Sequence, residues 1–434
     1  MAPFNIPAEV WFQIFNFLPL ADLKTVMLVC KDFYSVCERE TLWKNVILSR
    51  RKLSRSDAEA ELSTIKMERF KFKQKINIKD YIEDSSEMEE SQKQTISRNL
   101  LTYCCSKDHV EELSLHNTNL SHIGVNLLEK CILRLKTVNL SNSSINQNEL
   151  TTILSTIPYS STLKSIDFSY MSFSNISPRI LQEAVKHVEY FHVNQSNLTP
   201  EQCENIVQGL ESNPNISSLG LASQHNMRLL PNEALVKLIS QNLKILNLNE
   251  MMFNTSQIGI VLHKISEVKT LIELDIKGWN FSEVDTTLVA ATLSDIEKLR
   301  LMEVEFGPGQ GDALLKHINY KQKTKEINLY GVNLKDVDKT IFAETLKRIE
   351  QVVLSMTDLT YEQIVGLLQG MKHDFGLRNF TINNHLVKKV DIKVVCDAII
   401  TLEHLTLMVI GMERKMVTEM ISTGELFLIF LETN

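Results

Sequence analysis

Glycine and proline are scarce in this sequence: 14 Gly and 9 Pro among 434 residues make about 5% of the chain, against a usual share of about 12%. Collagen-like, proline-rich and Gly/Ser-linker proteins are therefore excluded. The sequence also lacks an apolar run near the roughly 18 residues of a membrane span. Met1–Asn5 shows no basic segment before an apolar core. We therefore expect no membrane association and no secretory signal.

Cysteine is also infrequent and irregularly spaced. The seven cysteines are odd in number, and none belongs to a CxxC motif. This pattern argues against a disulfide framework or a zinc site, and it favours reduced thiols in the cytoplasm or nucleus. We predict no metal and no cofactor. The formal net charge of −7 argues against general nucleic-acid binding.

A repeated pattern occupies most of the chain. The template L-x-x-L-x-L, with another apolar residue ten positions after its first residue, recurs at spacings of 25, 27 or 28 residues. Repeats of this length are typical of solenoids. The twelve copies begin at Val110, Leu135, Leu163, Val188, Ile216, Leu243, Leu271, Ile296, Thr324, Ile349, Leu377 and Leu402.

Each copy has the pattern of a strand, a turn and a helix. The L-x-L pair alternates as in a short strand, and an amphipathic stretch follows it. Thr199-Pro200-Glu201-Gln202 has the form of a helix-capping box with proline at the first helical position, and Thr360-Tyr361-Glu362-Gln363 repeats the box. One such unit cannot bury its own apolar face, so stacking of neighbouring units must form the core.

These repeats resemble the leucine-rich repeat family. The resemblance implies an α/β fold of the ribonuclease-inhibitor type, a horseshoe with a parallel sheet inside the curve and helices outside. The family usually has Asn or Cys eight positions after the first Leu, and this sequence departs from that rule, which leaves the turn geometry open. Those positions hold Thr118, Ser143, Met171, Ser196, Gln224, Met251, Trp279, Val304, Val332, Thr357, His385 and Ile410.

Residues 1–48 do not fit the repeat and have the pattern of a small helical module. Val10, Ile14 and Leu18 share one helical face, and Leu23 and Cys30 share another. So short a module cannot bury all of its large apolar side chains, and some of them must face a partner.

The order of residues from Ile6 to Trp43 resembles the F-box family, with Ile6 where Leu is usual. The resemblance implies binding to a Skp-type adaptor, and through it to a cullin–RING assembly. An F-box followed by leucine-rich repeats is similar to the substrate receptors of SCF-type ubiquitin ligases. The adaptor-binding residues implied by the resemblance are Pro7, Ile14, Leu18, Leu23, Val29, Cys30, Phe33, Leu42 and Trp43.

Three segments follow from these patterns. Residues 1–48 form the F-box, and residues 49–104 form a linker and an N-terminal helical cap, with Ile96–Tyr103 helical. Residues 105–434 form the solenoid of about 12 repeats, closed by a capping strand in Glu425–Asn434.

The strand residues that face away from the core predict a substrate surface. Side chains two, four and six positions after each repeat start point away from the core, and opposite charges then face each other on neighbouring strands. Either these charges only neutralise one another, or they form a docking patch with Met302 and Tyr330 as apolar anchors. Tyr190 and His192 form a second candidate. The predicted substrate-binding residues are Asp275, Lys277, Lys298, Arg300, Met302 and Tyr330.

Enzyme motifs are absent from the sequence. Gly307–Gly311 is the only glycine-rich loop, and Asp312 follows it where a phosphate loop would have Lys, so we interpret it as a turn. The resemblance to F-box and leucine-rich-repeat proteins thus implies a non-catalytic substrate-recognition subunit of an SCF-type E3 ubiquitin ligase with an unknown protein substrate. Two alternatives remain open, a non-degradative interaction scaffold and a pathogen effector that borrows the host ligase. An enzyme or small-molecule receptor built on the horseshoe has the least support.

Overall fold

The computed structural model describes residues 8–15, 75–77, 97–99, 101–102, 104–106, 108, 110–121, 123–239, 242–371, 376–399 and 404–407. The chain divides into two compact units, Met1–Asn213 and Pro214–Asn434. The division falls inside the predicted repeat region of residues 105–434. The predicted capping strand in Glu425–Asn434 lies outside the described residues.

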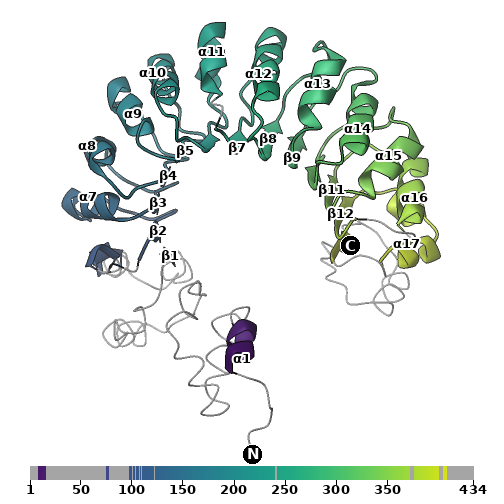
Figure 1. Ribbon diagram of the computed structural model, residues 1–434, viewed down its shortest axis with the longest axis horizontal. Helices are drawn as coiled ribbons and strands as arrows, with labels where there is room; N and C mark the ends of the chain where they lie inside the picture. Colours follow the sequence, from purple (N-terminus) through teal and green to yellow (C-terminus); the bar gives the residue numbers. More distant parts are fainter. Residues whose placement is uncertain are drawn as a thin grey trace, which may run out of the picture. The chain divides into compact units, whose positions relative to one another are not determined.

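The first unit contains helix α1 and a run of parallel strands, each followed by a helix. The strands are neighbours in chain order, and Figure 1 shows helices α7 to α10 on one side of them. The strands are β1 (Lys75–Asn77), β2 (Glu112–Ser114), β3 (Thr137–Asn139), β4 (Ser165–Asp167) and β5 (Tyr190–His192). The helices are α1 (Ala8–Phe15), α7 (Val125–Arg134), α8 (Gln147–Thr156), η3 (Ile157–Tyr159), α9 (Pro178–Val185) and α10 (Pro200–Glu211).

The second unit repeats the same plan, with helices again on one side of a parallel sheet (Figure 1). Its strands are β6 (Ser218–Gly220), β7 (Ile245–Asn247), β8 (Glu273–Lys277), β9 (Lys298–Met302), β10 (Glu326–Asn328), β11 (Gln351–Ser355), β12 (Asn379–Asn383) and β13 (His404–Leu407). Its helices are η4 (His225–Leu229), α11 (Asn232–Leu238), α12 (Thr255–Glu267), α13 (Thr286–Leu293), α14 (Gln310–Lys321), α15 (Lys339–Leu346), α16 (Tyr361–Gly370), η5 (Val387–Lys389) and α17 (Ile392–Ile399).

The twelve predicted repeats match strands β2 to β13 one for one. Each of the strands β2 to β13 begins two residues after a predicted repeat start, so the strand prediction is confirmed. Strand β1 was not predicted. It pairs in parallel with β2, Ile76 opposite Leu113, inside the segment assigned as linker and cap. The template misses it because Lys73 stands where a repeat has its first apolar residue.

The core lies between the sheet and the helices and is made of the repeated apolar positions. Leu274 and Ile276 of β8 and Leu299 and Leu301 of β9 are fully buried. Aromatic rings join successive repeats in the second unit, where the Trp279 ring lies 5.6 Å from that of Phe253 in the preceding repeat and the Phe281 ring lies 5.7 Å from that of Phe306 in the next. Stacking of repeats therefore supplies the core, as the pattern predicts.

The turn after each strand is built around a left-handed residue. The residue seven positions after the repeat start has a positive φ in the first ten repeats, and only Gly278 and Gly331 among them are glycine. The next position, where the family has Asn or Cys, donates a hydrogen bond to a carbonyl of the preceding repeat in several units: Thr357 Oγ1 to Leu329 at 2.8 Å and Trp279 Nε1 to Leu248 at 3.0 Å. In these units a hydroxyl or an indole N–H donates the bond from the position where the family usually has Asn or Cys, and the residue before it has a positive φ.

Helix N-termini link neighbouring repeats. The predicted capping boxes at Thr199 and Thr360 are both present. In each of them the glutamine amide also donates from Nε2 to two carbonyls of the preceding repeat, at 2.7 to 2.8 Å. Gln310 does the same from the glycine-rich loop, whose Gly309 is the residue before α14. That loop is therefore a turn into a helix, as predicted.

Helical residues precede β2, as expected for Ile96–Tyr103. Residues 97–99, 101–102 and 104–106 are helical, and we call them the preceding helix. The Arg134 guanidinium of α7 donates a hydrogen bond to the carbonyl of Cys104. The preceding helix is thereby attached to the helix of the first repeat.

Candidate interaction surfaces

Helix α1 presents apolar side chains to solvent. Val10 and Ile14 lie one helical turn apart and are 45% and 42% exposed. On another face, Phe15 is buried, and its ring lies 5.7 Å from that of Trp11. Exposed β-branched residues on one face of a short helix are typical of a docking surface. Ile14 is the predicted adaptor contact that the structure describes. The other predicted adaptor contacts lie outside the described residues: Pro7, Leu18, Leu23, Val29, Cys30, Phe33, Leu42 and Trp43.

The six predicted substrate residues lie together in the second unit. Strands β8 and β9 pair with Glu273 opposite Lys298, Asp275 opposite Arg300 and Lys277 opposite Met302. In both strands buried residues alternate with partly exposed ones, so the five predicted residues that these strands carry face away from the core. Tyr330 follows β10 on the same face. The structure therefore brings the predicted set onto one continuous surface.

Ion pairs run across this surface. Arg300 pairs with Glu273, Lys298 Nζ lies 2.8 Å from Glu326 Oε1, and the ammonium of Lys277 lies between two carboxylates. Its distances are 2.8 Å to Glu250 Oε1 and 3.4 Å to Glu303 Oε2. These side chains are partly exposed, so each pair adds little to stability. The mutual neutralisation of opposite charges, one of the two predicted alternatives, is therefore present on this surface.

The pKa values follow from these partners. The hydrogen bond from Lys277 holds the pKa of Glu250 below its usual value, and the Ser223 hydroxyl acts in the same direction. Asp275 behaves in the opposite way: burial raises its pKa, while Asn249 and Arg300 lower it only in part. Asp275, the only carboxylate of the predicted set, thus has a charged form that the fold disfavours.

Apolar side chains border the charged area. Tyr330 is 36% exposed and Met356, on the next turn, is 62% exposed. The Gly331 amide donates to the Ser355 carbonyl at 3.0 Å, which ties the two turns together. A Cβ at Gly331 would lie 2.9 Å from Cγ of Glu303, so glycine lets that carboxylate side chain rest against the turn beside Lys277. Met356 was not among the predicted residues, because it lies seven positions after its repeat start and the strand alternation covers only positions two, four and six.

The second candidate, in the first unit, is smaller. Tyr190 of β5 is exposed, and His192 lies opposite Asp167 of β4. Burial lowers the pKa of His192, and the carboxylate of Asp167 opposes that effect. The imidazole is thus favoured in its neutral form, which offers no cation for a substrate.

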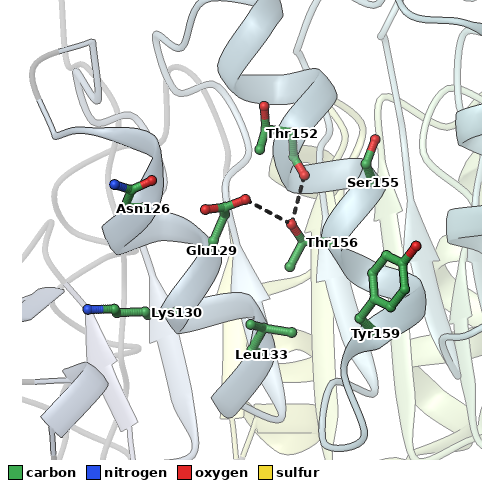
Figure 2. Close-up of a pocket in the computed structure, with 8 residues that line it drawn as sticks. All are labelled: Asn126, Glu129, Lys130, Leu133, Thr152, Ser155, Thr156 and Tyr159. Atoms are coloured by element: carbon green, nitrogen blue, oxygen red, sulfur yellow. Dashed lines mark hydrogen bonds between the residues drawn. The ribbon is translucent and has the colours of Figure 1, made fainter.

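A depression lies on the helical side of the first unit, between α7 and α8 (Figure 2). Its volume is about 630 Å³, and its lining residues are Asn126, Glu129, Lys130, Leu133, Thr152, Ser155, Thr156 and Tyr159. Thr156 bridges the two helices, with its hydroxyl 2.8 Å from the Thr152 carbonyl and 3.5 Å from the Glu129 carboxylate. The lining holds no histidine or cysteine, and the Thr156 hydroxyl is engaged with the Thr152 carbonyl of its own helix.

Two general features complete the description. Among the described residues, no group of three or more His, Cys, Asp or Glu side chains has the arrangement of a metal site. None of the described helices has both the length and the apolar content needed to cross a bilayer.

Comparisons with known proteins agree with this architecture. Residues 4–49 match the F-box-like family model. A chain of the crystal structure of the Rad7 and Elc1 complex in yeast is 15% identical with a TM-score of 0.50, and the match covers 97% of this chain and 92% of that chain. The leucine-rich repeat-containing protein LegL7 from Legionella pneumophila is 14% identical with a TM-score of 0.31, covering 75% of this chain and 95% of that chain. Comparison with curated proteins gives no match. The predicted fold class is confirmed: an F-box-like segment precedes a leucine-rich-repeat solenoid.

Proposed function

We propose that this chain is the substrate-recognition subunit of an SCF-type E3 ubiquitin ligase, acting in the cytoplasm or nucleus. Its F-box-like segment binds a Skp-type adaptor, which joins it to a cullin–RING assembly, and its repeats bind a protein substrate. The chain itself is non-catalytic and works by bringing the substrate close to the transfer machinery.

The main support is the match of residues 4–49 to the F-box-like model, together with the exposed Val10 and Ile14 of α1. Repeats with a continuous polar surface are suited to holding a protein segment. The fold of this chain also resembles that of a chain in the crystal structure of the Rad7 and Elc1 complex. That similarity to a protein found in a complex supports the proposal that this chain, too, binds another protein.

Adaptor binding is tested by capture of the full-length protein on a purified Skp-type adaptor. We expect wild type to bind and Ile14→Asp to bind at least about tenfold more weakly, because a carboxylate would be buried in an apolar interface. Leu18→Asp combined with Trp43→Ala should abolish binding. Tyr320→Asp is the matched control, because it places the same charge on an exposed aromatic position of α14. Failure of wild type to bind, or equal binding by Ile14→Asp, would refute the adaptor role.

The substrate surface is proposed to consist of Asp275, Lys277, Lys298, Arg300, Met302 and Tyr330, with Met356 added from the structure. Its chemistry is a field of paired charges bordered by exposed apolar side chains. The paired charges give register and selectivity, while the apolar side chains supply contact area.

Proximity labelling in cells tests this surface. We expect proteins labelled by the Ile14→Asp variant to accumulate, because they are bound but not delivered for degradation. Tyr330→Ala combined with Met356→Ala should lose them, whereas Tyr159→Ala, an exposed tyrosine on the helical side, should retain them. Unchanged half-lives of the labelled proteins when the chain is depleted would favour the non-degradative scaffold instead.

A further inference from the structure

Three cysteines gather where the preceding helix meets α7. Cys104 and Cys131 are buried, and Cys105 is partly exposed. The first two side chains are thus closed off from solvent, while the third is accessible. The proposed function uses none of these thiols.

The positions of Cys105 and Cys131 are reciprocal. The Cys105 thiol lies 3.6 Å from the carbonyl of Leu127, which is one helical turn before Cys131 in α7. The Cys131 thiol lies 4.0 Å from the carbonyl of Leu101, which is one turn before Cys105 in the preceding helix. Each thiol therefore points at the helical turn that carries the other. The two side chains therefore lie at one crossing point of the two helices.

The surroundings make the two sulfurs chemically unequal. The neighbouring Cys131 side chain lowers the pKa of Cys105, as do the charges of Arg134 and Lys130, while burial acts in the opposite direction. The neighbouring Cys105 side chain and burial raise the pKa of Cys131. Burial raises the pKa of Cys104 to about 12. A partly accessible thiol with a lowered pKa, beside a buried thiol, has the arrangement of an attacking and a resolving cysteine.

We propose that Cys105 and Cys131 are a peroxide-sensitive thiol pair that closes to a disulfide between the preceding helix and α7. The Cys105 thiolate attacks one oxygen of hydrogen peroxide, so that an S–O bond forms, the O–O bond breaks and hydroxide leaves as water after taking up a proton. The Cys131 sulfur then attacks the sulfur of the resulting sulfenic acid. The S–S bond forms, the S–O bond breaks, and the Cys131 proton leaves with the second water. Two thiols and one peroxide thus give one disulfide and two waters.

The bond would tether the preceding helix to the first repeat across β2. It would close a loop from residue 105 to residue 131, restricting the unfolded chain and raising the thermal stability of this end of the solenoid. The change is reversible by thiol–disulfide exchange, since Cys105 remains partly accessible.

Peptide mapping of the full-length protein tests the pair. The protein is treated with hydrogen peroxide and digested without reduction, and a peptide linking Cys105 to Cys131 is expected, removed by dithiothreitol. Cys104→Ser should keep this link. In Cys131→Ser we expect Cys105 to stop at the sulfenic acid and to be trapped by dimedone at least about tenfold faster than Cys203. Burial raises the pKa of Cys203 to about 12, which makes it a matched slow control.

Other results would overturn the proposal. One is the absence of a Cys105–Cys131 link in wild type under conditions that oxidise other cysteines of the chain. A second is a link that pairs Cys104 with either partner instead. A third is trapping of Cys105 in Cys131→Ser no faster than that of Cys203. Each of these readouts is independent of adaptor binding, so failure here leaves the proposed function untouched.

Discussion

A single carboxylate, Asp275, shows how a residue on the binding surface differs from its neighbours. Its side chain is 16% exposed, and its Oδ1 atom is buried without a hydrogen-bond partner. Arg300 remains 4.0 Å from Oδ2 because Glu273 holds the guanidinium. Burial therefore dominates, and the pKa of Asp275 in the folded protein lies above its ordinary value. The charge costs stability at neutral pH, which is consistent with a group kept for binding.

Asp275→Asn should therefore stabilise the protein at neutral pH. An acid whose folded pKa is raised reduces stability above that pKa, and the penalty disappears at lower pH where both states are protonated. We expect the Tm of the variant to rise by about 2 °C at pH 7 and to equal that of wild type near pH 3.5. Scanning calorimetry at the two pH values measures this. A lower Tm at pH 7 would show that the Arg300 contact outweighs the burial.

Glu250→Gln provides the opposite case on the same surface. The Lys277 hydrogen bond lowers the folded pKa of Glu250, so its contribution is present above the unfolded pKa and is lost as the pH falls through the folded pKa. We expect a Tm decrease of about 1 °C at pH 7 and none near pH 3. The side chain is partly exposed, so added salt should shrink the effect.

Among the helices, a buried glutamine in the first turn links neighbouring repeats. Gln363 Oε1 accepts from the Thr360 amide at 2.8 Å, and its Nε2 donates to the carbonyls of Leu334 and Val337 at 2.8 and 2.7 Å. One amide thus caps its own helix and satisfies two carbonyls of the preceding repeat. Buried carbonyls left without a donor are costly, so this side chain cannot be replaced by an apolar one of similar size.

Gln363→Leu should lower the free energy of unfolding by about 2–4 kcal/mol, because two carbonyls and one helix-end amide lose their partners. Urea unfolding followed by circular dichroism gives the value. Gln369→Leu is the matched control, since that glutamine lies exposed in the same helix and should change stability by less than about 0.5 kcal/mol. Similar losses in the two variants would mean that the amide does not carry the link.

The contrast between prediction and structure is clearest for these elements. Strand positions followed from the sequence because apolar residues must recur wherever strands stack, and the boxes at Thr199 and Thr360 carry a recognisable side-chain pattern. Strand β1 could not be predicted, because Lys73 stands where the repeat template requires an apolar residue. The bonds from Trp279 and Gln310 to a preceding repeat were also not predicted, since a local pattern does not say which carbonyl lies opposite a side chain. On the binding surface, alternation and register sufficed to group the six residues, but the exposure of Met356 depends on a left-handed turn.

At the scale of the whole molecule, repeats that contact only their neighbours make stability local. In the second unit β11 pairs with β10 and β12, and its core residue Leu354 is fully buried. A destabilising substitution in β11 should therefore lower the local stability of the adjoining repeats most, and that of more distant repeats less. The reason is that the stability of a solenoid is approximately a sum of nearest-neighbour interface terms.

Leu354→Ala should create a cavity costing about 2–5 kcal/mol. Hydrogen exchange followed by mass spectrometry should show faster exchange in β10, β11 and β12, with β7 close to wild type. Val353→Ala is the matched control, because Val353 is next to Leu354 on the outward face of the same strand. Equal acceleration in β7 would instead indicate one cooperative unit without local opening.

The regular succession of parallel strands also sets a spacing rule for any bound segment. Successive strands lie about 4.8 Å apart, whereas consecutive residues of an extended peptide advance about 3.4 Å. Because the two spacings differ, consecutive residues of such a peptide cannot each stay opposite one strand. A helical partner advances about 5.4 Å per turn, closer to one strand per turn. Side chains from β8, β9 and β10 are thus better matched to partner residues three or four apart than to consecutive ones.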